Sequence, residues 1–525
     1  MSSGQPNKRN ALYFQNMAQH SSKIYEFFGV TPGFTPGQTP PISRIFNINV
    51  NATPPDVTTP PDTATAAGFI DGRVATTSDG HVPNGRPING VVKEPALPAP
   101  PVTLRRSAFR ALVQDFNPLW FTIPLNTTIL SLLFRLLPSH FNFPGRSTIS
   151  LVLITLALVL FAITSFLFLL RLVWFRRSAY DEISSSAGDD ILPLATGEVP
   201  RGGMYGASGT GFLFLPCWPA VWLGIVAFAA LDGAEAQIGN RPTSFVRFAY
   251  VGWWVGVVWT VLVFFTMLGW ILSSPRAGRR TPGGQLSKIM ALVVMTSVLA
   301  MVGWVGGLLG LELGGGEVIS VQLLGPVVVF SFCAIGAAVV LAFFGFAVLM
   351  HELVLVTGWP PPEQTSNMFF LVGPMGQGAA ASLYLGAAVE RCVDIAGDRN
   401  RGSVPSPRAA QSVHVVCILL ALFLVSMAVV WLVLSFMAVL FRLSRRELQW
   451  NPTLNGTVFP VASLGFAMAQ LSDVLQSRFL GVLDCVLLVL SSVFFIVHLL
   501  LTFVHIFQGR LLIIREDRRL IASLD

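Results

Sequence analysis

The chain has 525 residues, of which 53% are hydrophobic and only 12% charged, and its formal net charge is +7. Soluble domains carry about 25% charged residues, so this composition excludes an ordinary soluble enzyme or binding module. The basic residues stand in short pairs beside apolar runs, such as Arg176-Arg177 and Arg445-Arg446, which is a membrane-topology pattern and not a nucleic-acid signal. The chain is therefore predicted to be a helical membrane protein whose first partner is the lipid bilayer.

The first part of the chain differs in composition from the rest. Residues 1–104 are rich in Pro, Thr, Ala, Asn and Gly and contain few large apolar side chains. Such a segment cannot bury enough surface to offset its ordering entropy, so we predict a disordered cytoplasmic tail. No apolar run follows the polar first residues, and we expect no cleavable signal peptide. We expect a ten-helix transmembrane domain over 105–510 and a short cytoplasmic tail over 511–525.

Ten apolar spans follow the tail, and most reach the length of about 20 residues that crosses a bilayer. Basic loops after the second, fourth, eighth and tenth spans place both termini in the cytoplasm. Two loops disagree, because the one after the sixth span lacks Lys and Arg and 391–410 carries four arginines on the assigned outer side. The spans are expected at 116–137, 147–174, 211–231, 247–272, 288–311, 320–350, 368–390, 411–441, 453–472 and 479–508.

Proline or glycine clusters interrupt the odd-numbered spans, whereas the even-numbered spans are long and mostly smooth. A helix break is tolerated in lipid where protein or a water-filled cavity satisfies the freed backbone groups. The alternation predicts an inner set of broken helices that lines a path, inside an outer ring. Interhelical hydrogen bonding is an equally good interpretation of the polar candidates. The candidate lining residues are Pro124, Asn126, Thr127, Thr128, Pro216, Pro219, Gly303, Gly306, Gly373, Pro374, Gly376, Gln377, Gly378, Asn455 and Thr457.

Charged groups are scarce inside the spans, and no Lys or Arg occupies the middle of a broken span. This disfavours a proton pump with a carboxylate relay and an intramembrane hydrolase. The five cysteines show no metal-ligand spacing, so neither a metal nor a cofactor is expected. Broken helices expose half-helix N-termini, which attract an anion without a fixed charge that would trap it. The pattern favours a channel or transporter for a small inorganic or organic anion.

Three stretches, 116–134, 359–386 and 450–471, resemble the tellurite-resistance/dicarboxylate transporter family. That family includes guard-cell slow anion channels, fungal malate transporters and fungal sulfite efflux pumps. The resemblance implies an all-α membrane fold of ten helices, arranged as five hairpins in a quasi-fivefold ring around a central pore, with the odd helices inside. It also implies a plasma-membrane location and a homotrimer in which each chain holds its own pore.

The resemblance also implies a gate at Phe459, the residue before Pro460 in the ninth span; without it, Phe459 is better interpreted as core packing. The sequence GPMGQG at 373–378 is similar to an element of the sulfite efflux pumps, which favours sulfite or bisulfite efflux down its electrochemical gradient over malate transport. One stretch departs from the family: Leu125-Asn126-Thr127-Thr128 stands where members often read M-G-T-G. The alternative of another class is a transport-dead receptor or scaffold with the same fold.

Overall fold

In the computed structural model, all of the described residues belong to the part of the chain from Arg106 to Asp525. The predicted tails at 1–104 and 511–525 lie outside the described residues. The described residues are 108–114, 116–138, 141, 143–176, 212–238, 244–273, 282–313, 321–360, 362–396, 406–447, 450 and 452–507.

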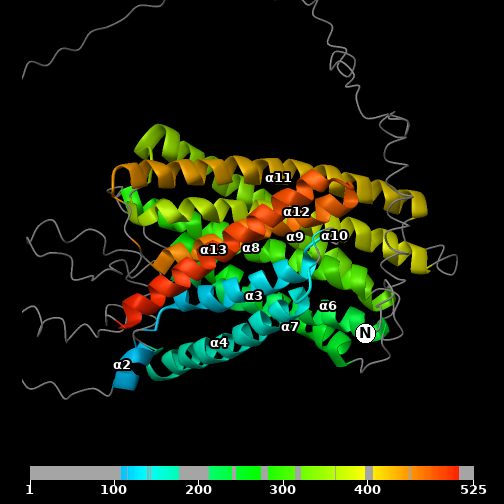
Figure 1. The fold of residues 1–525 in the computed structure, drawn as a ribbon, viewed down its shortest axis with the longest axis horizontal. Coiled ribbons are helices and arrows are strands. Elements are labelled where there is room, and N and C mark those ends of the chain that lie inside the picture. Colours follow the sequence, from blue (N-terminus) through cyan, green and yellow to red (C-terminus); the bar gives the residue numbers. More distant parts are fainter. Residues whose placement is uncertain are drawn as a thin grey trace, which may run out of the picture. The chain divides into compact units, whose positions relative to one another are not determined.

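Ten long helices in the described part form five consecutive hairpins (Figure 1), as the sequence predicts. Nine of the described helices are long and apolar enough to cross a membrane, and a shorter apolar helix covers Cys217–Gly233. A short helix, α2 (Ala108–Gln114), packs against the first hairpin. The hairpins are α3 (Thr122–Leu136) with α4 (Arg146–Trp174), α6 (Cys217–Ile238) with α7 (Ser244–Ser273), α8 (Pro282–Glu312) with α9 (Val321–His351), α10 (Val372–Ala396) with α11 (Pro407–Ser444), and α12 (Val458–Val474) with α13 (Arg478–Phe507).

The first helices of the five hairpins form a closed inner ring. Each contacts the next in the order α3, α6, α8, α10 and α12, and α12 returns to contact α3. Each second helix packs against its own partner and against the following inner helix, so that α13 reaches α3. The described helices therefore confirm the predicted fivefold ring with the odd helices inside.

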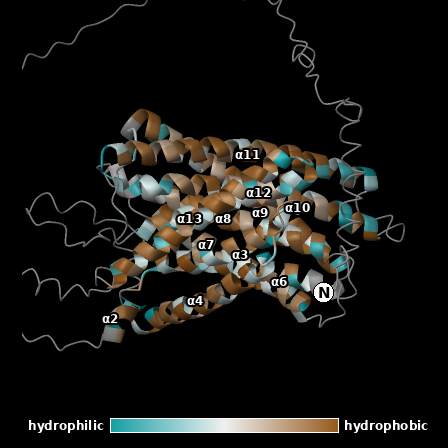
Figure 2. Cartoon of the chain, viewed as in Figure 1, coloured by the Kyte–Doolittle hydropathy of each residue, from teal (hydrophilic) through white to brown (hydrophobic). Residues whose placement is uncertain are grey.

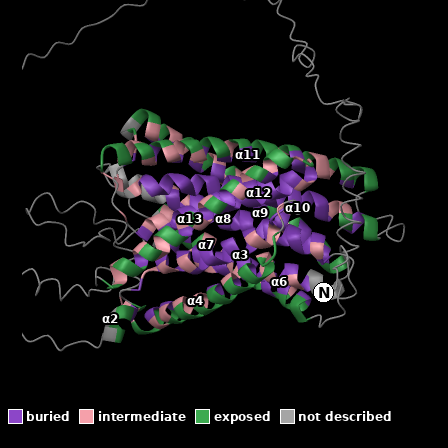
Figure 3. Ribbon diagram, in the orientation of Figure 1, coloured by how far each residue is buried: buried purple, intermediate pink, exposed green. Residues whose placement is uncertain are grey.

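Burial separates the two rings clearly (Figure 3). Between 72% and 100% of the residues in the most apolar stretches of α3, α8, α10 and α12 are buried, against 17% to 39% in the five outer helices. The exposed faces of α4 and α11 are nonetheless strongly hydrophobic (Figure 2). A surface of exposed apolar side chains around a buried helical core suits a lipid environment, because the hydrocarbon region contains no water.

Four inner helices start in the same way. A 3₁₀ segment precedes each helix, and a proline stands at its third residue. Proline is tolerated there because the N–H groups of the first helical turn have no intrahelical partner. The interruptions are thus at helix starts and not in mid-span. The 3₁₀ segments are η2 (Pro118–Phe121), η4 (Phe212–Phe214), η6 (Pro362–Leu371) and η8 (Pro452–Thr457), and the prolines are Pro124, Pro219, Pro374 and Pro460.

The fifth predicted break is wrong, because α8 is one continuous helix over Pro282–Glu312. Its glycines at positions 303, 306, 307 and 310 lie where the neighbouring helices of the same chain approach it closely. A Cβ built on Gly307 would lie 2.9 Å from the backbone N of Leu385 in α10. Small residues at helix contacts allow backbones to approach in membrane proteins, so the glycines of α8 serve packing within the ring.

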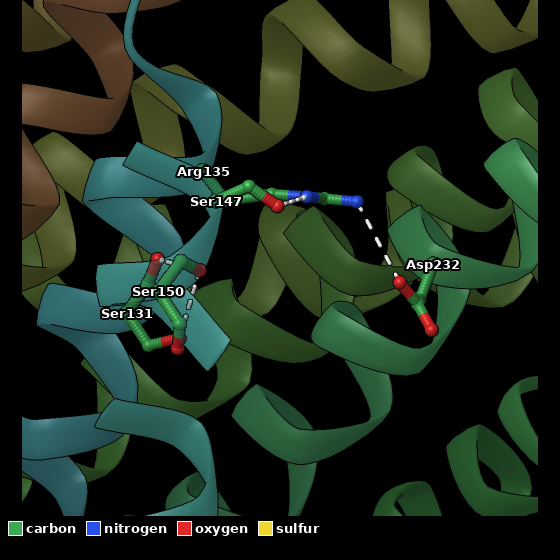
Figure 4. Close-up of polar contacts among 5 residues, drawn as sticks. All are labelled: Ser131, Arg135, Ser147, Ser150 and Asp232. Carbon is green, nitrogen blue, oxygen red and sulfur yellow. Dashed lines mark hydrogen bonds and ion pairs between the residues drawn. The ribbon is translucent and has the colours of Figure 1, made fainter. Parts of the chain in front are cut away.

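Polar contacts join the end of α3 to the start of α4, next to the turn of the first hairpin (Figure 4). The hydroxyl of Ser131 donates to the carbonyl of Ser150 at 2.7 Å, and the hydroxyl of Ser150 donates to the carbonyl of Ser131 at 2.8 Å. The Arg135 guanidinium donates to the Ser147 hydroxyl at 2.9 Å and reaches across to Asp232 of α6, with 3.6 Å between Nη2 and the carboxylate. These contacts hold α3 to α4 and to the next inner helix.

Candidate functional site

A small cavity lies inside the ring, near the starts of the inner helices. Its volume of about 30 Å³ accessible to a water-sized sphere is enough for one or two water molecules. All five hairpins contribute to its wall. The lining residues are Thr122, Leu125, Asn126, Phe214, Cys217, Ala220, Val294, Ser297, Val298, Phe370, Gly456, Phe459 and Pro460.

The wall of the cavity contains no charged side chain, and most of its few polar groups already form hydrogen bonds within the protein. The hydroxyl of Thr122 donates to the carbonyl of Leu119 at 2.7 Å, and that of Ser297 donates to Val293 at 3.2 Å. Asn126 donates from Nδ2 to the carbonyl of Asn455 at 2.6 Å, while its buried Oδ1 has no hydrogen-bond partner within the described chain. The cavity thus offers weak polar contacts without a fixed charge.

Phe459 reaches into the lumen from the start of α12. Its side chain is 8% exposed and lines the cavity. A Cβ built on Gly373 of α10 would lie 3.5 Å from Cε1 of Phe459 and 2.8 Å from Oγ of Ser297 on α8. A Cβ at position 373 would be in ordinary contact with the Phe459 ring and would come too close to the Ser297 hydroxyl. The ring lies next to groups from two other inner helices.

Two further aromatic residues flank the cavity, and the sequence analysis missed both. The rings of Phe214 and Phe370 meet edge to face with centroids 5.8 Å apart, and both are buried. Gly456 lies against them, since a Cβ built there would be 2.7 Å from Phe370 Cε1. The available sequence signal was their position inside the predicted third and seventh spans, a few residues before Pro216 and Pro374.

The starts of α3, α6, α10 and α12 surround the cavity, since each helix or its 3₁₀ segment supplies lining residues. The N-terminal end of a helix carries a partial positive charge of about half an elementary charge. Four such ends favour an anion in the cavity.

The other polar candidates lie in hydrogen bonds between or within helices. Thr127 and Thr128 donate to the carbonyls of Ile123 and Pro124, each at 2.8 Å. Asn455 Nδ2 lies 3.4 Å from the Thr502 hydroxyl of α13, and Thr457 Oγ1 lies 3.4 Å from Nε2 of His498 on the same helix. Thr128 also fills the space in front of Gly224, beside Met301.

Several predicted lining residues are placed elsewhere by the ring, because the direction of a helical side chain depends on its neighbours. Gly303 and Gly306 face Ile335 and Ser331 of α9, and Gly378 faces outer helices too. These three glycines were predicted to line the path, but in the structure they face the side chains of neighbouring helices. Gly376 lies against the backbone of α12. Pro124, Pro216, Pro219 and Pro374 are buried at helix starts outside the cavity wall, and Gln377 is buried one turn beyond Gly373.

A closed ring of five hairpins, with an apolar outer surface and a small cavity that all five hairpins line, is typical of a helical membrane channel or transporter. The family model for SLAC1-type voltage-dependent anion channels matches residues 115–503, and the chain belongs to this family. The matched range begins three residues before η2 and ends within α13, so it includes the whole inner ring. No curated protein shows a significant match to the chain. Membership of this family establishes that the protein is an anion channel or transporter.

Proposed function

We propose that this protein exports sulfite or bisulfite across the plasma membrane, through the lumen of the inner ring, with Phe459 as the gate. The observation that carries this proposal is the position of the Phe459 ring, beside Gly373 and in the wall of a cavity between the helix starts. An inside-negative potential drives the anion outward with about 2.3 kcal/mol per charge for each 100 mV. We further propose that the chain forms a homotrimer, with a separate path in each chain.

The geometry supports gating by a steric and dry constriction. The cavity has room for one or two water molecules, and the buried Phe459 ring presents an apolar surface to it. Hydrophobic constrictions close pores because water leaves them. When the ring turns away, the helix ends attract the anion weakly and polar groups such as Ser297 replace part of its water. The absence of a charged group from this wall allows the anion to leave again.

Flux through the purified full-length chain in proteoliposomes tests the anion. We expect sulfite to pass faster than malate, because GPMGQG at 373–378 is similar to an element of the sulfite efflux pumps. Nitrate and chloride serve as reference anions. Malate passing faster than sulfite would favour the malate alternative. No flux of any of the four anions through either the natural chain or its Phe459→Ala variant would favour the receptor or scaffold alternative.

That alternative rests on one observation in the wall of the cavity. Asn126 stands where family members often carry glycine, and it narrows the cavity while binding the carbonyl of Asn455. An anion needs that space to pass.

Orientation in the membrane is proposed from the basic loops, with both termini in the cytoplasm. In a cysteine-free background, a membrane-impermeant thiol reagent should not label Arg279→Cys in sealed cells, because the loop after the fourth span would be inside. Glu317→Cys, in the loop after the fifth span, is the matched control and should be labelled. Strong labelling of Arg279→Cys from outside would contradict the orientation.

A further inference from the structure

A second aromatic layer crosses the lumen beyond the Phe459 cavity. Trp304 of α8 and Phe466 of α12 stack with their ring centroids 4.7 Å apart and their planes at 16°. Both side chains are less than 2% exposed. In the inner ring α10 lies between α8 and α12, so the stacked rings bridge the space in front of α10. Phe466 follows Phe459 by seven residues, which places it about 10 Å further along the same face of α12.

The face of α10 behind this pair carries Gln377. Gly373 faces Phe459, and Gln377 follows it by four residues, one turn further on the same face. The ring of Tyr384, two turns beyond Gln377 on this face, lies 6.3 Å from the ring of Trp304. Along the axis of the ring, Gln377 therefore lies between Phe459 and Tyr384. Side chains on a helix point toward its N-terminus, so the rings of Trp304 and Phe466 extend toward the position of Gln377.

Gln377 and Trp304 are both fully buried, at 0% exposure. Neither amide atom of Gln377 has a hydrogen-bond partner in the described chain, and the indole N–H of Trp304 has none either. Buried polar groups are normally hydrogen-bonded, because an unpaired one loses its bonds to water without replacement. Two unpaired groups on adjacent inner helices, at neighbouring levels of one lumen, point to a ligand that supplies the missing partners.

We propose that Gln377 and Trp304 form a second anion-binding position in the lumen, specific for a small oxyanion. The Gln377 amide and the Trp304 indole donate hydrogen bonds to its oxygens, and neither residue carries a charge that would hold the anion too strongly. A protonated oxyanion also donates to Oε1 of Gln377. The stack of Trp304 on Phe466 fixes the indole and covers the position. This inference rests on the proposed path through the lumen and assigns the groups that select the anion.

Nitrate binding to the purified full-length protein tests the proposal without requiring transport. Nitrate should raise the melting temperature relative to gluconate at equal ionic strength, because a ligand of the folded state stabilises it. Gln377→Leu removes both amide donors at similar volume, and Trp304→Phe removes the N–H while keeping a ring that stacks. Each variant should raise the apparent dissociation constant for nitrate about tenfold, the effect of losing one hydrogen bond to a charged group.

Trp431→Phe is the matched control. Its indole is also fully buried, lacks an acceptor in the described chain and packs against Phe346, but it lies on the outer helix α11. This variant should keep the nitrate dissociation constant of the natural chain. The proposal is overturned if nitrate does not stabilise the natural chain. It is also overturned if Gln377→Leu and Trp304→Phe have the same nitrate dissociation constant as the natural chain, or if Trp431→Phe raises that constant as much as they do.

A measurement of nitrate flux tests this proposal separately from the proposed function. If a Phe459→Ala chain conducts nitrate, adding Gln377→Leu should raise the half-saturating nitrate concentration about tenfold. An unchanged half-saturation overturns the binding position and leaves the path through the lumen standing. If Phe459→Ala conducts no anion, the proposed function fails, whereas the binding experiment still decides on Gln377 and Trp304.

Discussion

Phe459→Ala should raise anion conductance about tenfold or more, because each 1.4 kcal/mol removed from a barrier multiplies a rate by ten. The ring lines the cavity beside Gly373 and Ser297, so its loss enlarges that small space and removes an apolar surface from its wall. Current through cells or flux through proteoliposomes, normalised to the amount of protein at the surface, is the measurement. The direction of the change in conductance matters most, because shortening a buried side chain rarely increases the activity of a protein.

Core packing predicts the opposite result for the same substitution. A buried phenylalanine cut to alanine costs about 3–5 kcal/mol of stability, so less folded protein would reach the membrane. Phe168→Ala is the matched control, because Phe168 is buried on the outer helix α4 and packs edge to face against Phe121 and Trp218. It should lower stability without raising conductance. A well-inserted Phe459→Ala protein with unchanged or lower conductance would remove Phe459 from the gate.

Gly376→Ala should destabilise the inner ring more than most single substitutions, by about 1–3 kcal/mol or more. A Cβ at this position would lie 2.7 Å from the backbone N and 2.9 Å from the Cα of Leu464 on α12. Backbone atoms of a packed helix cannot move aside as a flexible side chain can, so α10 and α12 would have to separate. The melting temperature in detergent and the yield of monodisperse protein are the measurements.

Gly269→Ala provides the control for this substitution. Gly269 lies on the exposed part of the outer helix α7, and a Cβ built there meets nothing within 4 Å. Alanine is also the better helix former, so this variant should match or exceed the stability of the natural chain. Equal stability of Gly376→Ala and Gly269→Ala would show that α10 and α12 are less tightly packed than described.

The ring was predictable from the sequence, because its cause is visible along the chain. Interrupted spans alternate with long apolar ones, and lipid tolerates an interrupted helix only where protein or a water-filled cavity covers it, which places the interrupted spans inside. The number of hairpins and their fivefold closure are what the family resemblance implies. The exact place of the interruptions was less accessible. A proline such as Pro460 can break a helix or begin one, and only the 3₁₀ segment before Val458 shows that it begins one.

The candidate site was predictable only in part, since it depends on the direction in which each side chain points. Gly303 and Gly373 stand in similar glycine-rich spans, yet the first faces α9 and the second faces Phe459. That difference comes from the rotation of α8 and α10 in the ring. The stack of Trp304 on Phe466 joins residues far apart in the sequence, and no local pattern indicates it.

Cys217 allows the central claim, an anion path through the lumen, to be tested most directly. Its thiol lies in the wall of the cavity and is buried. In a Phe459→Ala chain, a negatively charged methanethiosulfonate reagent should reach this thiol along the same path as the anion and block the flux. The same reagent should leave the flux of Phe459→Ala with Cys217→Ala unchanged. Flux through Phe459→Ala that the reagent does not reduce, or equal block after Cys217 is removed, would contradict a path through this cavity.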